Sequence, residues 1–421
     1  MSSGLFNKHT ILKGILMTFL SICLIGTDAK GQELEQFIKE GVLNNSALKA
    51  KYKAFEAALT RVSQEGTLPD PNLSFGYFVS PVETRVGPMQ ARFSLNQMFP
   101  WFGTLKKKKT VSALLAESKF QEFLQAKHSL IAEIKKGYYQ IYETRSQLTL
   151  LQDELQIFDV YKSLVTTSFS AGNGTLTDII QIDLQREEIK ISISVLEDQL
   201  SLQTTQFSLL IEEEKGEIVP VELTIPAIDP VFLDIDSVEN NPYLKAIDQQ
   251  MLAMKEKQQL TVLNSYPKIG LGLDYTMIGE GPDPNVSNSG RNALMPMVTM
   301  SLPIFRSKYK SAITEINLKT DELALKKQAY ANSLMADYSG MKFEMEKARK
   351  RSQLFEEQIN RISEVIELLY TAYSNSGKDF DEVLKAKQQQ LRYRMEKVTI
   401  IKQYFTAQAA VELITAKGTE K

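Results

Sequence analysis

Few side chains in this sequence are of the types that commonly catalyse reactions or bind metal. The 421 residues include one cysteine, Cys23, and two histidines, His9 and His128. Zinc sites with several cysteine or histidine ligands are therefore not expected, and no glycine pattern of a nucleophilic serine turn is present. His128 lies in a charged stretch and is expected at the surface. Only carboxylates remain for catalysis, so we expect neither an enzyme nor a cofactor.

The first residues have the pattern of a secretory signal peptide. Two lysines precede an apolar run at 15–26, and small residues occupy both cleavage positions before a cut after Gly31. The run is shorter than the roughly 20 residues of a membrane-spanning helix. We therefore expect residues 1–31 to direct export and to be removed. Because Ile22 precedes Cys23, we expect this cysteine to be lost with the leader rather than lipidated.

Charge excludes one class of partner. The chain has 49 basic and 51 acidic residues, for a net charge of −2. Nucleic-acid-binding domains are usually strongly basic, so no nucleic acid is expected. An exported chain without a further long apolar run is soluble, peripheral or a β-barrel.

An internal repeat organises the remaining chain. NNSALKA at 44–50 recurs as NNPYLKA at 240–246, and FSAGNGTLTDII at 169–180 matches YSNSGKDFDEVL at 373–384. Proline-led strand entries and exits recur in the same order between these points. Matches in one order along the chain indicate a tandem duplication.

The duplication predicts the division of the chain. Two structural repeats at 32–218 and 237–421 are joined by an extended, proline-rich linker at 219–236. Each repeat is predicted to contain a helix of about 30 residues, two strands, a very long helix, a glycine-bearing break and a helix of about 40 residues.

The predicted strands alternate between apolar and small or polar residues. This alternation is clear at 72–80, 91–99 and 269–277, and less regular in LMPMVTMSL at 294–302. Alternation over about ten residues is typical of transmembrane β-strands. A half-buried strand of a soluble antiparallel sheet alternates equally well.

The predicted long helices dominate each repeat. Residues 103–170 and 307–374 contain no proline, and as straight helices each would reach about 100 Å. Apolar residues between Ile131 and Phe158 are spaced by three, four or seven, as in a coiled coil. Such helices must pack lengthwise on one another.

The strands set the expected assembly. Four strands cannot close a transmembrane barrel, since the smallest barrels have about eight. An open sheet edge in lipid would leave backbone groups without hydrogen bonds. Three chains would supply twelve strands and a bundle of long helices.

With these motifs and PWFG at 100–103 matching PIFR at 303–306, the sequence resembles the TolC-like outer-membrane efflux proteins. The resemblance implies a mainly α fold with a small β part. Three protomers form a twelve-stranded transmembrane β-barrel that continues as an α-helical barrel in the periplasm. It also implies a passive exit duct in the outer membrane, which contacts outer-membrane lipid, a periplasmic adaptor and an inner-membrane pump of the RND type.

The resemblance assigns residues to the periplasmic tip. The adaptor-docking residues it implies are Phe169, Gly172, Gly174, Tyr373 and Gly377. The second repeat departs from the pattern, because Ser376 stands where glycine is expected. A helix–helix turn that needs glycine explains the same residues.

The resemblance further implies a gate of acidic residues after the tip turns. Glu382 occupies such a position and Asp178 is its counterpart, whereas Lys385 stands where a second acid is expected. Symmetry-related carboxylates in a constriction would attract cations. A solvated helix charge is the alternative interpretation of Glu382.

At the other end of the long helices, aromatic residues meet positive charge. The expected membrane-interface anchor comprises Phe99, Trp101, Phe102, Lys106, Lys107, Phe305 and Arg306. Aromatic rings favour the lipid–water boundary, and long basic side chains extend towards headgroups.

The sequence leaves the substrate open. Met295, Met297 and Met300 cluster at one strand. Thioethers suit Cu(I), although methionine is more often apolar packing. Heavy-metal cations of the Cu/Ag type and small toxic compounds are both possible substrates. The competing hypothesis is a periplasmic coiled-coil scaffold without channel activity.

Overall fold

The computed structural model describes most of the chain after the predicted leader. The described residues are 29–172, 174–213, 218, 220, 222–226, 235–283, 285, 287–376 and 380–416. Residues 1–28, with Cys23, and residues 377–379, with Gly377, lie outside them, so the leader stays a prediction. None of the described helices combines the length and the apolar character needed to cross a membrane.

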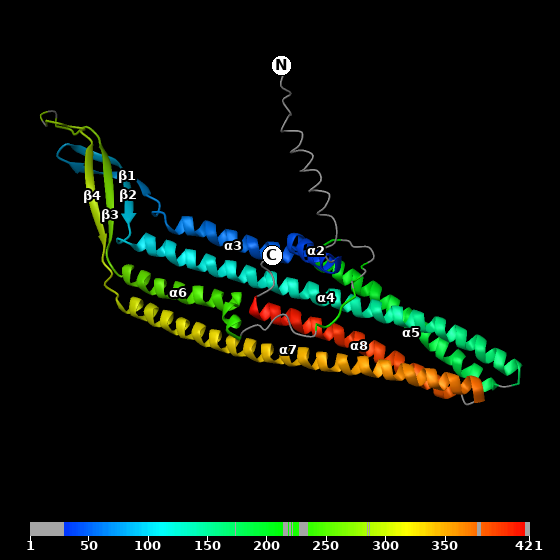
Figure 1. Ribbon diagram of the computed structural model, residues 1–421. Coiled ribbons are helices and arrows are strands. Elements are labelled where there is room, and N and C mark those ends of the chain that lie inside the picture. Colours follow the sequence, from blue (N-terminus) through cyan, green and yellow to red (C-terminus); the bar gives the residue numbers. More distant parts are fainter. Residues whose placement is uncertain are drawn as a thin grey trace, which may run out of the picture. The chain divides into compact units, whose positions relative to one another are not determined.

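The first repeat contains four helices and two strands (Figure 1). The helices are α2 (Ala29–Asn44), α3 (Ser46–Glu65), α4 (Thr104–Ser170) and α5 (Leu176–Ile211). The strands β1 (Asn72–Thr84) and β2 (Gly87–Phe99) lie between α3 and α4. The predicted proline-free segment therefore forms one helix, α4, of 67 residues.

The second repeat has the same order of elements. A 3-10 turn, η1 (Ile235–Asn240), leads into α6 (Pro242–Leu263), and β3 (Lys268–Ile278) and β4 (Ala293–Ser301) follow. The helices α7 (Ser307–Ser376) and α8 (Phe380–Thr415) complete the repeat. The order of elements predicted from the duplication is confirmed.

The prediction of one opening helix of about 30 residues is wrong. In the first repeat Asn45 divides the segment into α2 and α3, and its side chain accepts a hydrogen bond of 2.9 Å from the Leu48 N–H. In the second repeat Asn241 caps α6 and accepts from the Tyr243 N–H at 3.0 Å. The repeated asparagine pair is thus a helix start, because asparagine is among the best N-cap residues.

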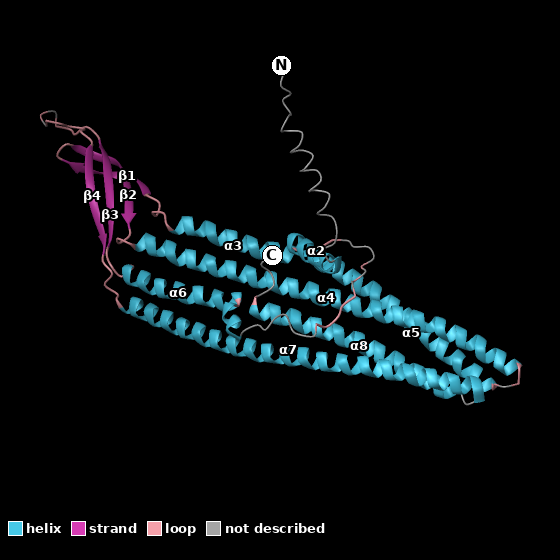
Figure 2. Cartoon of the chain, in the orientation of Figure 1, coloured by secondary structure: helices cyan, strands magenta, loops and turns pink. Residues whose placement is uncertain are grey.

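The four strands form one antiparallel sheet in the order β1-β2-β3-β4 (Figure 2). Residues that face one another across strands share a side of the sheet. Leu73, Leu95 and Leu273 lie in one such row, and Phe75, Phe93 and Tyr275 lie in the next. Rows of small and polar residues alternate with these, so one side is apolar and the other polar. The predicted alternation is confirmed for most of β1, β2 and β3, whereas Met98 of β2 and Met295 and Met297 of β4 lie in the rows of small and polar residues.

The described chain divides into two compact units. One comprises residues up to Asn44 with 134–225 and 350–402, and the other comprises 45–133, 226–349 and 403–421. The sheet belongs to the second unit and the turn between α4 and α5 to the first. In the first unit Tyr142 of α4 donates at 3.4 Å to the carbonyl of Leu223, within the predicted linker, and Arg145 donates at 3.0 Å to that of Ile218, just before it.

Candidate functional site

The turn between α4 and α5 holds four of the residues predicted for the docking tip or gate. Gly172 has a φ of +81°, a left-handed conformation that favours glycine. A Cβ at Gly174 would lie 2.9 Å from the backbone nitrogen of Phe169, so a larger residue does not fit there. Both glycines therefore have a role in the turn itself, as the alternative interpretation stated.

The aromatic residue of this turn is accessible. The Phe169 side chain is 43% exposed, and Leu176 at the start of α5 is 57% exposed. Exposed apolar side chains beside a tight turn form a small surface that a partner can bury. The structure thus leaves Phe169 available, and its contact with an adaptor stays a prediction.

Asp178 has a defined structural role in the same turn. Its backbone N–H donates to Thr175 Oγ1 at 3.2 Å, and its carboxylate accepts from the Thr175 N–H at 3.1 Å. This reciprocal pair is a capping box, which satisfies two free donors at the helix start. Asp178 is also buried, with 7% of its side chain exposed.

The helix pair α4–α5 forms a first hairpin and the pair α7–α8 a second one. The second hairpin differs from the first at the positions equivalent to those just described. Tyr373 is buried, and its ring packs edge-on against Phe380 with the centroids 5.0 Å apart. Glu382 is exposed in the first turn of α8. Lys385 forms an ion pair of 2.5 Å with Asp381 one turn away. The two acids predicted for the gate therefore have different surroundings, and only Glu382 is exposed.

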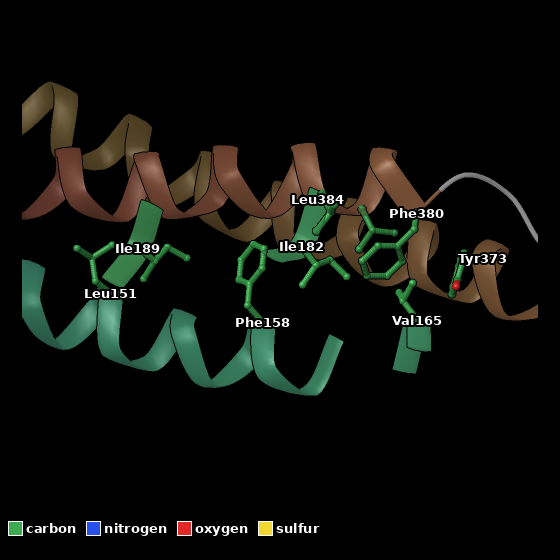
Figure 3. Close-up of a cluster of buried hydrophobic side chains, with 9 residues drawn as sticks. Leu151, Phe158, Val165, Ile182, Ile189, Tyr373, Phe380 and Leu384 are labelled. Carbon is green, nitrogen blue, oxygen red and sulfur yellow. The ribbon is translucent and has the colours of Figure 1, made fainter. Parts of the chain in front are cut away.

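A hydrophobic cluster connects the ends of the two hairpins (Figure 3). Phe158 of α4, Ile182 of α5 and Phe380 of α8 are almost completely buried in it. Tyr373 joins the cluster from α7. The seam predicted along α4 supplies Leu151 and Phe158, so the coiled-coil spacing is confirmed here.

Glu154 is a buried carboxylate that the sequence did not reveal. It lies one turn from both Leu151 and Phe158, and only 3% of it is exposed. One of its oxygens, Oε1, has no hydrogen-bond partner in the described structure. Burial raises the pKa of Glu154, and nearby Lys387 and Arg394 oppose this shift. Burial likewise lowers the pKa of Lys387.

Two other groups in the helices are affected by burial. Burial raises the pKa of Tyr161 to about 12, with the Glu154 charge as a smaller cause. His128 is buried rather than at the surface, so that prediction is wrong. Burial and then the charge of Lys127 lower the pKa of His128. Charged neighbours in sequence misled the prediction because His128 itself faces the interior of its helix packing.

The predicted anchor lies where β2 leads into α4. Gly103 has a φ of +82° in the turn that leads into the helix. Trp101 stacks on Tyr266 with the ring centroids 5.1 Å apart, and Phe99 ends β2. Phe102 is 82% exposed. At the matching position of the second repeat, Phe305 and Arg306 are exposed.

The lysines at the start of α4 have acidic partners. Lys107 forms an ion pair of 2.5 Å with Glu256 of α6, and Lys108 lies 3.7 Å from Glu65 of α3. Positive charge at a helix N-terminus opposes the helix dipole, and these carboxylates compensate it. Lys106 is exposed. The two lysines of the predicted anchor therefore differ, since only Lys106 is available for a headgroup.

Solved structures with the same architecture are found among outer-membrane channels. CusC superposes with a TM-score of 0.79 over 94% of this chain and 96% of its own, at 12% identity. VceC of Vibrio cholerae, an outer membrane protein, superposes with a TM-score of 0.75 at 14% identity. The superposition covers 93% of this chain and 98% of VceC. The chain has the TolC-like fold.

A third structure with the TolC-like fold is the outer membrane channel MtrE of Neisseria gonorrhoeae. It gives a TM-score of 0.72 at 15% identity, over 91% of this chain and 88% of its own. No family model and no curated protein sequence matches the chain. The likeness is thus carried by structure: the order of elements, the four-stranded sheet and the paired long helices.

Proposed function

We propose that the protein is the outer-membrane exit duct of a tripartite efflux system. It would conduct passively what an inner-membrane pump and a periplasmic adaptor deliver. The observation that carries this proposal is the combination of a two-sided sheet with long helices, in a fold that covers more than nine-tenths of both this chain and CusC.

The apolar side of the sheet supports placement in lipid. Leu73, Phe75, Tyr77 and Val79 of β1 are between 62% and 90% exposed. Four strands leave two open edges, which lipid cannot satisfy with hydrogen bonds. Three copies would close a twelve-stranded barrel with these residues outside and the polar side facing the lumen.

An apolar stripe on α5 supports the same homotrimer. Its residues recur at intervals of four or seven and are each 51–71% exposed: Leu176, Ile180, Leu184, Ile191, Val195, Leu202 and Leu209. Heptad spacing of this kind suits packing against another long helix. A neighbouring copy presents such helices, so we infer that the stripe lies at the interface between copies.

The docking tip and the membrane-interface anchor complete the proposal. Exposed Phe169, with the turn that Gly172 and Gly174 permit, is the proposed contact for the adaptor. Because Phe169 is exposed and Tyr373 is buried, the turn between α4 and α5 is the stronger surface. Phe102, Phe305 and the neighbouring basic residues Lys106 and Arg306 are proposed as the anchor at the lipid boundary.

The gate proposal rests on Glu382. Three copies would place three such carboxylates around the axis, where they favour cations. Asp178 contributes less, since its carboxylate takes part in the capping box. Lys385 is neutralised by Asp381 and does not oppose Glu382 directly. An RND-type pump and either heavy-metal cations or small toxic compounds are the proposed partner and substrates.

The assembly can be tested by fractionation of cells that express the full chain. We expect the protein in the outer-membrane fraction, where detergent extracts a trimer that dissociates only on heating. Recovery as a soluble monomer would contradict the proposal and favour a periplasmic scaffold. Replacement of Leu184 and Ile191 by glutamate should prevent trimer formation, whereas the same change at exposed, polar Gln206 should not.

A further inference from the structure

Two glycines leave a stretch of β3 without side chains on the polar side of the sheet. Gly270 and Gly272 of β3 lie on this side, between β2 and β4. Met98 and Thr299 face Gly270 from the two flanking strands, and Met297 faces Gly272. Because glycine has no side chain, the longer side chains of the neighbouring strands lie across β3.

Three donor atoms converge above Gly270. Thr299 Oγ1, Met98 Sδ and Asn96 Oδ1 all lie within 3.0 Å of the point where a Cβ of Gly270 would be. The Thr299 hydroxyl donates to Met98 Sδ at 3.8 Å, which orients the sulfur. The Cβ point is too close to the backbone for an ion, but it marks where the three atoms meet.

A second thioether lies one row along the sheet. The Met297 methyl carbon and the Asn96 side-chain amide carbon are 3.5 and 3.7 Å from the Cβ position of Gly272. Asn96 therefore borders both glycines. Its Oδ1 is buried and has no hydrogen-bond partner in the described structure. An acceptor in this state costs free energy unless a ligand satisfies it.

The charge around these atoms is balanced. Asp274, the carboxylate on the same side of β3, forms an ion pair with Arg92. The converging groups are an amide oxygen, a hydroxyl and thioethers, and all are neutral. Thioether sulfur binds soft cations and is a poor ligand for Mg²⁺ or Ca²⁺. A neutral donor set with sulfur suits a cation of low charge.

We propose that Asn96, Met98, Met297 and Thr299 form a binding site for a soft monovalent metal cation, Cu⁺ or Ag⁺. The inference deepens the proposed function, on which it rests for placing this side of the sheet in the lumen. It names soft cations as a substrate class that the channel binds in transit. No group of three or more histidine, cysteine or carboxylate residues in the described chain offers a metal site, so the thioethers carry the assignment.

The test is a Cu⁺ titration of the purified full-length protein in detergent, under reducing conditions, against the chromogenic chelator bicinchoninate. We expect wild type to withdraw Cu⁺ from the chelator, and Met98→Leu and Met297→Leu to bind at least tenfold more weakly. Met300→Leu is the matched control, because Met300 lies on β4 as Met297 does but is on the apolar side of the sheet, beside Ile269. We expect it to bind Cu⁺ as wild type does.

Gly270→Ala tests the geometry without removing a donor. Its methyl group would meet Met98 Sδ and Thr299 Oγ1, so we expect the same weakening as in Met98→Leu. Heat-dissociable trimers must form in every variant compared. Equal Cu⁺ binding by wild type, Met98→Leu and Met297→Leu, or no binding by wild type, would overturn the proposal. Conductance without Cu⁺ binding would reject only this site; Cu⁺ binding without conductance would reject only the duct.

Discussion

Thr175 and Asp178 exchange two hydrogen bonds across the first turn of α5. The pair therefore starts the helix directly after the tip turn. Its presence separates two explanations of an acidic residue at this position, a helix cap and a gate. The equivalent residue of the second repeat, Glu382, is also in the first turn of its helix.

Asp178→Ala should lower thermal stability. The change removes one half of the capping box, which costs about 1 kcal/mol. Thermal unfolding of the purified protein measures the effect. Asp198→Ala is the control, since Asp198 is an exposed acid on the same helix and should unfold at the wild-type temperature. Equal stability of the two variants would reject the capping role.

Glu382→Gln should change ion selectivity rather than stability. The substitution removes three charges from the proposed constriction of a trimer, so the preference for cations should fall. Reversal potentials in a salt gradient across a planar bilayer measure it. Glu364→Gln removes an exposed acid of α7 and should leave the preference unchanged. The same reversal potential in Glu382→Gln as in wild type would remove this residue from the gate.

Glu154→Gln should stabilise the protein at neutral pH. A buried carboxyl with a raised pKa favours the protonated form in the folded state, so wild-type stability falls as pH rises above the pKa of the unfolded chain, about 4.3. Each unit by which the pKa is raised corresponds to about 1.4 kcal/mol.

The advantage of Glu154→Gln should disappear below about pH 4, where glutamate is protonated in both states. Thermal unfolding at several pH values distinguishes this pattern. Glu364→Gln, at an exposed position, should show no such dependence. Lower stability of Glu154→Gln at neutral pH would mean that the attraction to Lys387 outweighs the cost of burial.

The duplicated asparagines allow a matched comparison. Asn241 caps α6 and is completely buried, and its Nδ2 also donates to the carbonyl of Ile414 at 3.1 Å. Asn45 caps α3 but is partly exposed. Asn241→Ala should therefore cost about 1 kcal/mol more than Asn45→Ala, because it also leaves a buried carbonyl unsatisfied. Equal melting temperatures would contradict this difference.

Much of the architecture was predictable because its causes are local. Alternation defines the strands, the absence of proline permits α4 and α7, and Gly103 marks the turn before α4. The break at Asn45 was missed because an asparagine inside an apolar periodic stretch resembles a tolerated polar residue. Only the second copy, where Pro242 follows Asn241, indicates a helix start clearly.

The chemistry of individual side chains was less predictable. Glu154 stands one position before the seam residue Leu155 of α4, and its burial depends on packing against α5 and α8. His128 is buried for a similar reason. The site around Gly270 requires the strand register, which brings Met98 and Thr299 together from different repeats. Contacts of this kind follow from tertiary structure and leave no local pattern.

The central claim is that three copies of this chain form a conducting channel. Its most direct test is single-channel recording of purified trimers in a planar lipid bilayer. We expect discrete conductance steps with a preference for cations, and none from the Leu184→Glu and Ile191→Glu double variant that prevents assembly. Intact trimers that insert into the bilayer without conductance would contradict the account.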